Sequence, residues 1–487
     1  MQTLHTSKSP KWQTLVYIVL TLILLGLAVT LISINLENQV IMAFDEARHG
    51  VNGYEMIRND DFLVHTYQGE PDFWNLKPPL SYWLIALHFK LFGYNCVAFR
   101  LHSAIATVFT LLAATLWTKK RHGMVVSLLV LLFLIINPAL YGLNFARTGE
   151  ADALHTLFVT LSMLCLLSSS RDIRWLYGSA LGFGFSFLAK SYHAAIIPMM
   201  CLLYLVLTGE VRKLKLKNYL LLFLFGLLPI LPWAIARYLR DGFTFFTQMF
   251  TTDVQARVSV DVDGKAAGNW YFYLLQLLRN PVAVAYSAMG AAALIWCKFF
   301  KPLHARKRET VGLLIWILFP LFLYSLSNFK LYHYIVPVMV PISMVGAMAA
   351  YMLFRQIKRR EIRAAFCALL IAGIAWQTTL NFKAVIARDD KGSMQATIAG
   401  ALDRDINSET HVYIQYNNGR TRWMQNDMLR ALLSGDVICL DGGAEAFEED
   451  DESALLIIDR EGMDEELLEY YPIYYESGYQ YQYVLEK

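Results

Sequence analysis

The feature that most constrains this chain is a run of apolar residues from Thr14 to Asn35 that contains no charged side chain. About 20 helical residues are enough to cross the hydrocarbon core of a bilayer, so the run predicts a membrane-spanning helix. A cleaved signal peptide is the alternative, because Lys8 and Lys11 precede the run as a basic leader would. The run is too long for a leader and no small-residue cleavage site follows Ile34, so we expect the span to be retained.

Similar apolar segments recur along the chain, separated by charged breaks. Hydrophobic residues make up 56% of the 487 residues and charged residues only 17%, which is too apolar for a soluble protein of this size. The length rule gives about eleven spans, and we therefore predict a mainly α-helical, polytopic transmembrane bundle. The spans are expected near residues 14–36, 101–118, 124–143, 153–169, 175–189, 193–208, 218–236, 281–297, 311–326, 334–354 and 363–380.

Charge is distributed unevenly between the two ends of the chain. Residues 388–487 hold 8 Lys and Arg against 22 Asp and Glu, whereas residues 1–387 hold 35 against 18. The positive-inside rule places the basic breaks and the N-terminus in the cytoplasm, and an odd number of crossings then delivers the acidic C-terminal part to the outer face of a cell membrane. Basic residues spread over short loops do not indicate nucleic-acid binding. The basic breaks are residues 119–122, 171–174, 212–217, 298–308 and 355–363.

The chain is predicted to have two parts. Residues 1–387 form the transmembrane part, with a first outer loop over 37–100 and a second over 237–280, and residues 388–487 form a small soluble α/β domain on the outer face. Apolar, aromatic stretches in the outer loops predict helices lying in the membrane interface. These stretches are Leu80–Phe92, Phe243–Phe250 and Trp270–Leu278.

Charged side chains gather just after the first span. Asp45, Glu46, Arg48 and His49 lie within five residues, in a segment that reads as helix, and Asp45 and His49 are one turn apart. Ionisable groups beside a membrane are costly and tend to mark substrate paths. The alternative is that Asp45 is a helix N-cap with Glu46 in the first turn, which helix physics alone would favour.

Further charges fall on the same predicted outer face. Lys77 precedes two prolines, so its backbone is stiff and extended, and a lysine there can compensate a phosphate charge. One surface thus collects several carboxylates and cations next to the membrane, as a lipid-phosphate donor would require. The other members are the turn 147–152, which ends in Asp152, and the cations Lys190, Arg257 and Lys330.

The order of these motifs resembles a known enzyme family. FDEARHG, KPPLSYWL, RTGEADAL, GFGFSFLAKS, LPW and KLYHYIVP follow one another as in the bacterial C-type glycosyltransferases, close to the lipid A aminoarabinose transferases and protein O-mannosyltransferases. The resemblance covers roughly residues 10–355. It implies inverting transfer of a sugar from undecaprenyl phosphate, or a related polyprenyl phosphate, to a lipid, glycan or protein acceptor.

The resemblance also implies roles for individual residues. Asp45 is expected to be the catalytic base, Asp152 matches a second acidic position, and no cofactor or metal is required. The residues expected to bind the donor phosphate are Lys77, Arg257 and Lys190, with which we group Lys330, and the expected supporting residues are Glu46, Arg48, His49 and Tyr334. A divalent ion held by Asp45, His49 and an acid of the second loop is the alternative mechanism.

Two other classes of function remain open from the sequence. A transporter or flippase of lipid-linked sugars would also place charges in a bundle of many spans, but it predicts paired half-chains with broken helices. A scaffold subunit would make the acidic C-terminal domain the functional part. Carboxylate plus lysine and arginine supplies the base and the phosphate-binding cations that sugar transfer needs, so we favour the enzyme.

Overall fold

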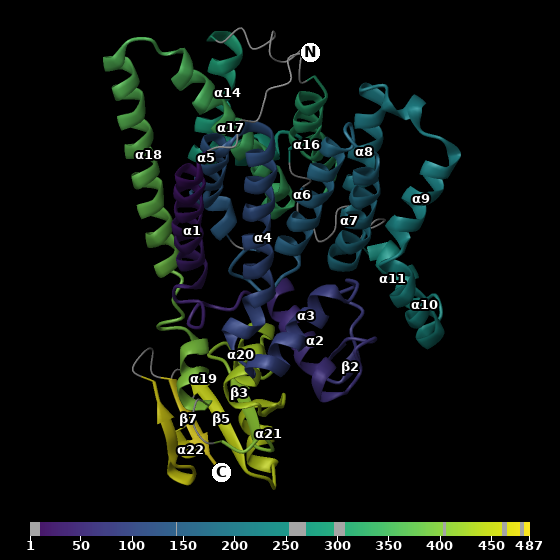
Figure 1. The fold of residues 1–487 in the computed structure, drawn as a ribbon. Coiled ribbons are helices and arrows are strands. Elements are labelled where there is room, and N and C mark those ends of the chain that lie inside the picture. The colour runs from purple at the N-terminus through teal and green to yellow at the C-terminus, as the bar shows by residue number, and fades with distance from the viewer. Residues whose placement is uncertain are drawn as a thin grey trace.

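The protein is a helical bundle with a β-sheet at one end (Figure 1). The computed structural model describes residues 10–142, 144–252, 269–296, 307–402, 406–459, 465–477 and 482–487. Figure 1 shows the N-terminus at one end of the bundle and the C-terminal sheet beyond the other end. The helices of the bundle are α1 (Lys11–Ser33), α4 (Cys96–His122), α5 (Met124–Ile135), α6 (Asp152–Ser168), α7 (Arg174–Lys190), α8 (Ile196–Leu207), α9 (Leu216–Leu227), α14 (Pro281–Trp296), α16 (Lys307–Ser325), α17 (Val336–Gln356) and α18 (Arg360–Ile386).

Each expected span contains a helix, but the count of eleven crossings is not confirmed. Within the described ranges, six helical segments are long and apolar enough to cross a membrane, or seven if a bent pair counts as one span. One of the six, residues 174–207, is divided into α7 and α8 by the 3₁₀ turn η2 (Ser191–Ala195). The chain is thus a multi-pass membrane protein by length and composition.

Helix length explains the lower count. The helix α5 has 12 residues, α6 has 17 and α14 has 16, which at about 1.5 Å per residue falls short of a hydrocarbon core of about 30 Å. The apolar run that predicted a span over 124–143 is cut after α5 because Asn137 caps the 3₁₀ turn η1 (Pro138–Tyr141), with proline in its first position. Apolar length in sequence therefore exceeds helix length.

The predicted span over 218–236 is bent. Helices α9 and α10 (Ile230–Asp241) meet at 56° across the break Leu228–Pro229, where proline cannot continue the hydrogen-bond ladder. The bend lies where α9 packs closely on α7, because a Cβ added at Gly184 would come within 2.5 Å of the carbonyl oxygen of Gly226. This pair, which the sequence predicted as a single span, is the one bent pair in the described part of the chain.

The helices α2 (Asp45–Arg58) and α3 (Leu80–Phe92) and the strand β2 (Glu70–Pro71), all from the first long loop, lie beneath the bundle in Figure 1. Each of the three stretches predicted as interfacial helices contains a helix. The helix α3 buries one face against α2 and α4 and exposes Leu87, Leu91 and Phe92 on the other. The other elements of the two long loops are β1 (Thr66–Tyr67), α11 (Thr244–Phe250) and α13 (Phe272–Arg279). The remaining 3₁₀ turns in the described part of the chain are η3 (Glu210–Lys213) and η6 (Tyr332–Ile335).

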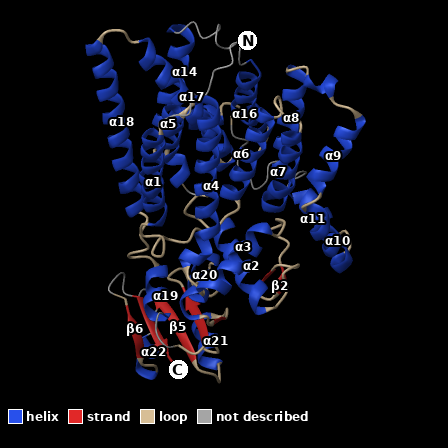
Figure 2. Ribbon diagram, in the orientation of Figure 1, coloured by secondary structure: helices blue, strands red, loops and turns tan. Residues whose placement is uncertain are grey.

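The C-terminal part contains a five-stranded mixed sheet flanked by helices (Figure 2). The strand order is β4-β3-β5-β7-β6, in which β3 pairs in parallel with β4 and β5 while β7 runs antiparallel to both neighbours. Its elements are α19 (Met394–Leu402), β3 (His411–Gln415), α20 (Gln425–Gly435), β4 (Ile438–Cys439), α21 (Gly443–Glu449), β5 (Ala454–Asp459), α22 (Glu465–Tyr470), β6 (Ile473–Glu476) and β7 (Gln482–Glu486). The division of the chain at residue 388 stays a prediction.

The sheet shares a hydrophobic core with the segment over residues 41–99. Buried side chains of α2, α3 and the start of α4 pack with those of α19, α20 and β3 in a single cluster, separate from the core of the bundle. Polar contacts add to this docking. Gln395 exchanges two hydrogen bonds with the backbone of Ile41, at 2.8 and 2.9 Å. Arg430 donates to the carbonyl of Glu37 at 3.1 Å and lies 3.2 Å from a carboxylate oxygen of Asp390.

We predict that Arg430→Met lowers the free energy of unfolding by about 3 kcal/mol, because it leaves the buried carboxylate of Asp390 without its cation. Thermal unfolding and limited proteolysis of the purified protein measure the effect. The matched control is Arg420→Met, since the exposed side chain of Arg420 donates to the backbone carbonyls of Arg422 and Trp423 and forms no ion pair with a described residue. Equal stability of the two variants would contradict the docking role of Arg430.

Candidate active site at the start of the second helix

The helix α2 begins directly after a strained residue. Phe44 has φ 68° and ψ −118°, a conformation that costs about 1–3 kcal/mol for a residue with a side chain. Its N–H donates to Oε1 of Gln425 at 3.1 Å, and its carbonyl accepts from the N–H of Arg48 at 2.9 Å. The cap of α2 is Phe44, so the alternative in which Asp45 is the N-cap is wrong. Among the described residues, no hydrogen bond or ion pair engages the half-buried Asp45 carboxylate.

Glu46, the neighbouring acid, is fully engaged. Its Oε1 lies 2.8 Å from Nε of Arg100, and neither side chain is exposed to solvent. The same oxygen accepts from the N–H of Gly149 at 3.1 Å, and Oε2 accepts from the N–H of Met42 at 2.8 Å. Glu46 therefore joins α2, α4 and the loop before α6, which is a structural role.

Two arginines, Arg100 and Arg147, bind backbone carbonyls between the end of α1 and the start of α2. Arg100 also donates to the carbonyls of Leu36, Gln39 and Val40. Arg147 donates to three carbonyls at the end of α1, which are those of Leu31, Ile32 and Ile34, so it caps that helix. These bonds fix the path of the chain from α1 to Asp45.

The loop that carries Lys77 is pinned to α2. Arg48 forms a two-bond ion pair with the carboxylate of Asp72, at 2.8 and 3.0 Å, and Asn52 donates to the same carboxylate at 3.0 Å. Asp72 in turn accepts from the N–H groups of Trp74 and Asn75. Burial opposes ionisation of Asp72, yet the hydrogen bonds from Arg48 and Asn52 lower its pKa to about 2. The supporting role expected of Arg48 is thus to position the loop.

His49 lies between these groups as a neutral imidazole. Its Nδ1 lies 2.7 Å from the carbonyl oxygen of Asp45, which can only accept, and 3.2 Å from Nδ2 of Asn75, which can only donate. We assign the proton to Nδ1 because the contact with the carbonyl oxygen is the shorter one. The buried Nε2 is then an acceptor, and no described residue donates to it. Burial lowers the pKa of His49 to about 4, against the opposing charge of Asp45, and His49 also interacts electrostatically with Lys77 and Asp152. The imidazole is therefore uncharged at neutral pH.

A second acid and its cation lie opposite α2. Asp152 begins α6 and Lys190 ends α7, and the Lys190 ammonium donates to Oδ1 of Asp152 with both side chains 7% exposed. The ammonium also lies 5.5 Å from the ring centre of Tyr334. Because the two charges balance, Lys190 offers a phosphate less net charge than an unpaired lysine would.

Glu150 supplies a carboxyl group of a different kind. It is buried, and its Oε2 accepts from Nδ2 of Asn144 at 2.5 Å. Burial, followed by the nearby charges of Asp152 and Asp45, raises the pKa of Glu150 well above its usual value. A protonated carboxylic acid in this loop can donate a hydrogen bond where its neighbours can only accept.

The structure gathers most of the predicted residues at one place. His49 interacts with Asp45, Lys77 and Asp152, and Asp152 interacts with Lys190. Lys330 is half-buried and donates to the carbonyl of its own loop residue Ser327 at 2.5 Å, while Arg257 lies outside the described residues.

Several positioning residues were not predicted from the sequence. Asp72 and Asn52 were missed because polar loop residues carry no signal of their distant partners. Arg100 was missed because it precedes the predicted span at 101–118. His333 was missed as well, although it interacts electrostatically with Asp152 and directly precedes Tyr334. For Arg100, one signal was available: an arginine beside a predicted span is costly to bury and therefore predicts an acidic partner, which is Glu46.

The residues do not fit the alternative mechanism with a metal ion. Among the described residues, no three His, Cys, Asp or Glu side chains are grouped so that they could hold one. The pairing of Glu46 with Arg100 removes the acid nearest to Asp45 from any such set.

Comparisons with known proteins place this geometry in context. Residues 76–235 match the family described as dolichyl-phosphate-mannose-protein mannosyltransferase. The undecaprenyl phosphate-alpha-4-amino-4-deoxy-L-arabinose arabinosyl transferase of Pseudomonas paraeruginosa is 29% identical over 67% of this chain and 59% of its own length. The enzyme of the same name from Pseudomonas aeruginosa is 30% identical over 64% of this chain and 56% of its own length. The chain thus spans less than two thirds of these relatives.

Solved structures show the same fold over nearly the whole chain. The crystal structure of ArnT from Cupriavidus metallidurans bound to undecaprenyl phosphate superimposes with a TM-score of 0.69 and 15% identity, covering 98% of both chains. The archaeal oligosaccharyltransferase AglB from Archaeoglobus fulgidus, in complex with an inhibitory peptide and a dolichol-phosphate, gives a TM-score of 0.56 and 11% identity over 92% of this chain and 70% of its own. The predicted resemblance in fold is confirmed.

We predict a large loss of stability on replacing Glu46 and almost none on replacing Asp45. Glu46→Ala should lower the free energy of unfolding by about 3–5 kcal/mol, because it leaves the Arg100 guanidinium buried without a counter-charge. Asp45→Asn is the matched control and should change stability by no more than about 0.5 kcal/mol. Thermal unfolding of the purified variants provides the measurement, and similar melting temperatures for both would refute the structural assignment of Glu46.

Proposed function

Because this chain has the C-type glycosyltransferase fold, we propose that it transfers a sugar from a polyprenyl-phosphate carrier to an acceptor of the cell envelope. The observation that carries the proposal is the grouping around Asp45. The carboxylate of Asp45, which has no hydrogen-bond or ion-pair partner among the described residues, interacts electrostatically with His49, as do Lys77 and Asp152, and Asp152 is paired with Lys190. The relatives named for aminoarabinose transfer from undecaprenyl phosphate support the same class of donor.

The chemistry follows from the charges of these residues. Asp45 takes the proton of the acceptor nucleophile, whose lone pair attacks the anomeric carbon of the sugar as the bond to the phosphate oxygen breaks. Lys77, with Lys190 behind it, stabilises the negative charge that develops on the departing carrier phosphate. A single displacement inverts the anomeric centre. Nε2 of His49 offers a neutral acceptor for a sugar hydroxyl beside the base.

The orientation in the membrane is part of the proposal. The helix α2, which begins at Asp45, and the helix α3, which follows the loop of Lys77, lie at the end of the bundle nearest the C-terminal sheet, and the link between α17 and α18 lies at the other end (Figure 1). The acceptor is then an outer-face glycolipid of the lipid A kind, a polysaccharide or a protein. The acidic part of the chain over 388–487 and the first outer loop are the surfaces that an acceptor would meet.

A flippase of lipid-linked sugars is less well supported. That class predicts broken helices in corresponding positions of two half-chains, and within the described ranges one bent pair, α9 and α10, is present. The loop that carries Lys77 is held on α2 by the contacts of Asp72 with Arg48 and Asn52. A fixed loop suits a reaction at one place, whereas a flippase must move its substrate across the bilayer.

We predict that Asp45→Asn lowers kcat for sugar transfer by about 10²–10⁴-fold, because an amide cannot accept the nucleophile's proton. The assay follows transfer from a polyprenyl-phosphate sugar by the purified protein in liposomes. Mass spectrometry of envelope lipids and glycans from a deletion strain would identify the acceptor to use. Near-normal turnover by a correctly folded Asp45→Asn variant would exclude Asp45 as the base.

We predict that Lys77→Gln damages donor use, with a raised KM for the carrier or slower loss of its phosphate, because the cation facing the phosphate is removed. The matched control is Lys90→Gln, since Lys90 is exposed on α3 and its ammonium lies 4.5 Å from the ring centre of Phe62. Unchanged kcat and KM for Lys77→Gln, or equal losses in both variants, would argue against the phosphate role.

A further inference from the structure

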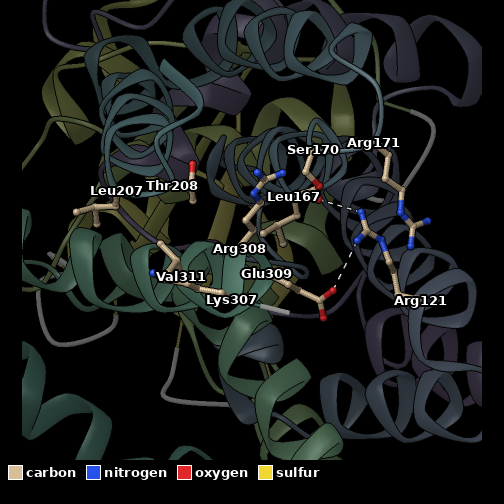
Figure 3. Close-up of a pocket in the computed structure, with 10 residues that line it drawn as sticks. All are labelled: Arg121, Leu167, Ser170, Arg171, Leu207, Thr208, Lys307, Arg308, Glu309 and Val311. Atoms are coloured by element: carbon tan, nitrogen blue, oxygen red, sulfur yellow. Dashed lines mark hydrogen bonds and ion pairs between the residues drawn. The ribbon is translucent and has the colours of Figure 1, made fainter. Parts of the chain in front are cut away.

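A basic cavity lies at the end of the bundle opposite the candidate active site. It has a volume of about 670 Å³ and lies where α4, α6 and α8 end and α16 begins (Figure 3). Four cations line it, which are Arg121, Arg171, Lys307 and Arg308, together with one acid, Glu309. None of these residues takes part in the proposed transfer of a sugar.

Two of the four cations are held in place by neighbouring acids. Arg121 donates to the carbonyl of Leu167 at 2.9 Å, and its other terminal nitrogen lies 3.6 Å from the carboxylate of Glu309. That carboxylate also meets Nε2 of His122 at 2.6 Å. Arg308 lies 2.5 Å from a carboxylate oxygen of Glu210. These contacts shape the wall of the cavity and fix its two arginines.

The other two cations have no such partner. Arg171 and Lys307 are exposed and form no ion pair with any described residue. Counting both nearby acids, Glu210 and Glu309, the four cations leave a surplus of two positive charges around one cavity. The carbonyl ends of α4, α6 and α8 carry partial negative charge and reduce this surplus, whereas the N-terminus of α16 adds to it. The cavity therefore attracts an anion.

The surroundings of the cavity identify the kind of anion. Leu207, one of its lining residues, is 57% exposed, and Leu314 and Leu318 on the adjacent helix α16 are 49% and 57% exposed. A charged cavity that borders exposed leucines on membrane-spanning helices offers contacts to a polar headgroup and to acyl chains together. Basic pockets between such helices on the cytoplasmic side bind anionic headgroups.

We propose that this cavity binds a phosphate-bearing anion, namely the headgroup of an anionic phospholipid of the cytoplasmic leaflet. Arg171 and Lys307 contact the headgroup phosphate, and Arg121 and Arg308 form the charged wall behind it. The leucines of α8 and α16 lie along the acyl chains. The proposal does not depend on the sugar-transfer activity, because the two sites are at opposite ends of the bundle.

The test compares lipid retention by full-length variants purified in detergent. Phosphatidylglycerol is the anionic probe, phosphatidylcholine the zwitterionic one, and native mass spectrometry counts bound lipids across a titration. Wild-type protein should bind phosphatidylglycerol in preference. Arg171→Gln with Lys307→Gln should weaken that binding about 25-fold, since each surface cation contributes a factor of about five.

The control for charge is Lys358→Gln with Arg359→Gln, which removes two exposed cations from a predicted cytoplasmic loop outside the cavity. It should leave the affinity for phosphatidylglycerol within about twofold of wild type. Equal losses in both double variants, or equal binding of the two lipids, would overturn the proposal. A competition experiment with inorganic phosphate tests the assignment to a lipid headgroup. Full displacement of phosphatidylglycerol by phosphate at a concentration similar to that of the lipid would overturn this assignment.

Discussion

The buried ion pair between Glu46 and Arg100 joins the three segments that surround the candidate active site. Neither side chain is exposed, and the same carboxylate also binds the backbone of Met42 and Gly149. A buried pair of this kind contributes little net stability compared with apolar residues, but removing one partner is costly. Its consequence is geometric, since it sets α2, α4 and the loop before α6 at fixed positions relative to one another.

This arrangement separates two adjacent acids that look alike in sequence. Glu46 turns inward to Arg100, and Asp45 stays half-buried beside His49, Lys77 and the Asp152–Lys190 pair. A carboxylate accepts a proton more readily when it is not paired with a cation. Glu46 forms the structural ion pair with Arg100, which leaves Asp45 available as a base. Burial near Asp45 keeps His49 neutral and favours the protonated form of Glu150, so acceptors and donors of protons lie close together.

Helices and strands that depend on local sequence were predicted well, whereas contacts between residues distant in sequence were not. Charge-free apolar runs gave the helices, and the alternation over 411–416 gave β3, because both depend on neighbours in sequence. The count of eleven spans is not confirmed, because the end of α5 and the bend before α10 depend on single residues such as Asn137 and Pro229. In the site, Asp45 and Lys77 were recognisable from motifs. The pairing of Lys190 with Asp152, and of Asp72 with Arg48, joins residues 38 and 24 positions apart and leaves no trace in local pattern.

The strained backbone of Phe44 links the two ends of the chain. Its N–H is held by Gln425 of α20, so the residue directly before the proposed base is fixed by a segment more than 300 positions away, which also shares its core with α2. The C-terminal sheet is therefore no interchangeable module. An evolving or engineered chain that exchanged this part for another would have to keep the Gln425 contact and the packing on α2, so a change in the C-terminal part would also disturb the position of the proposed base.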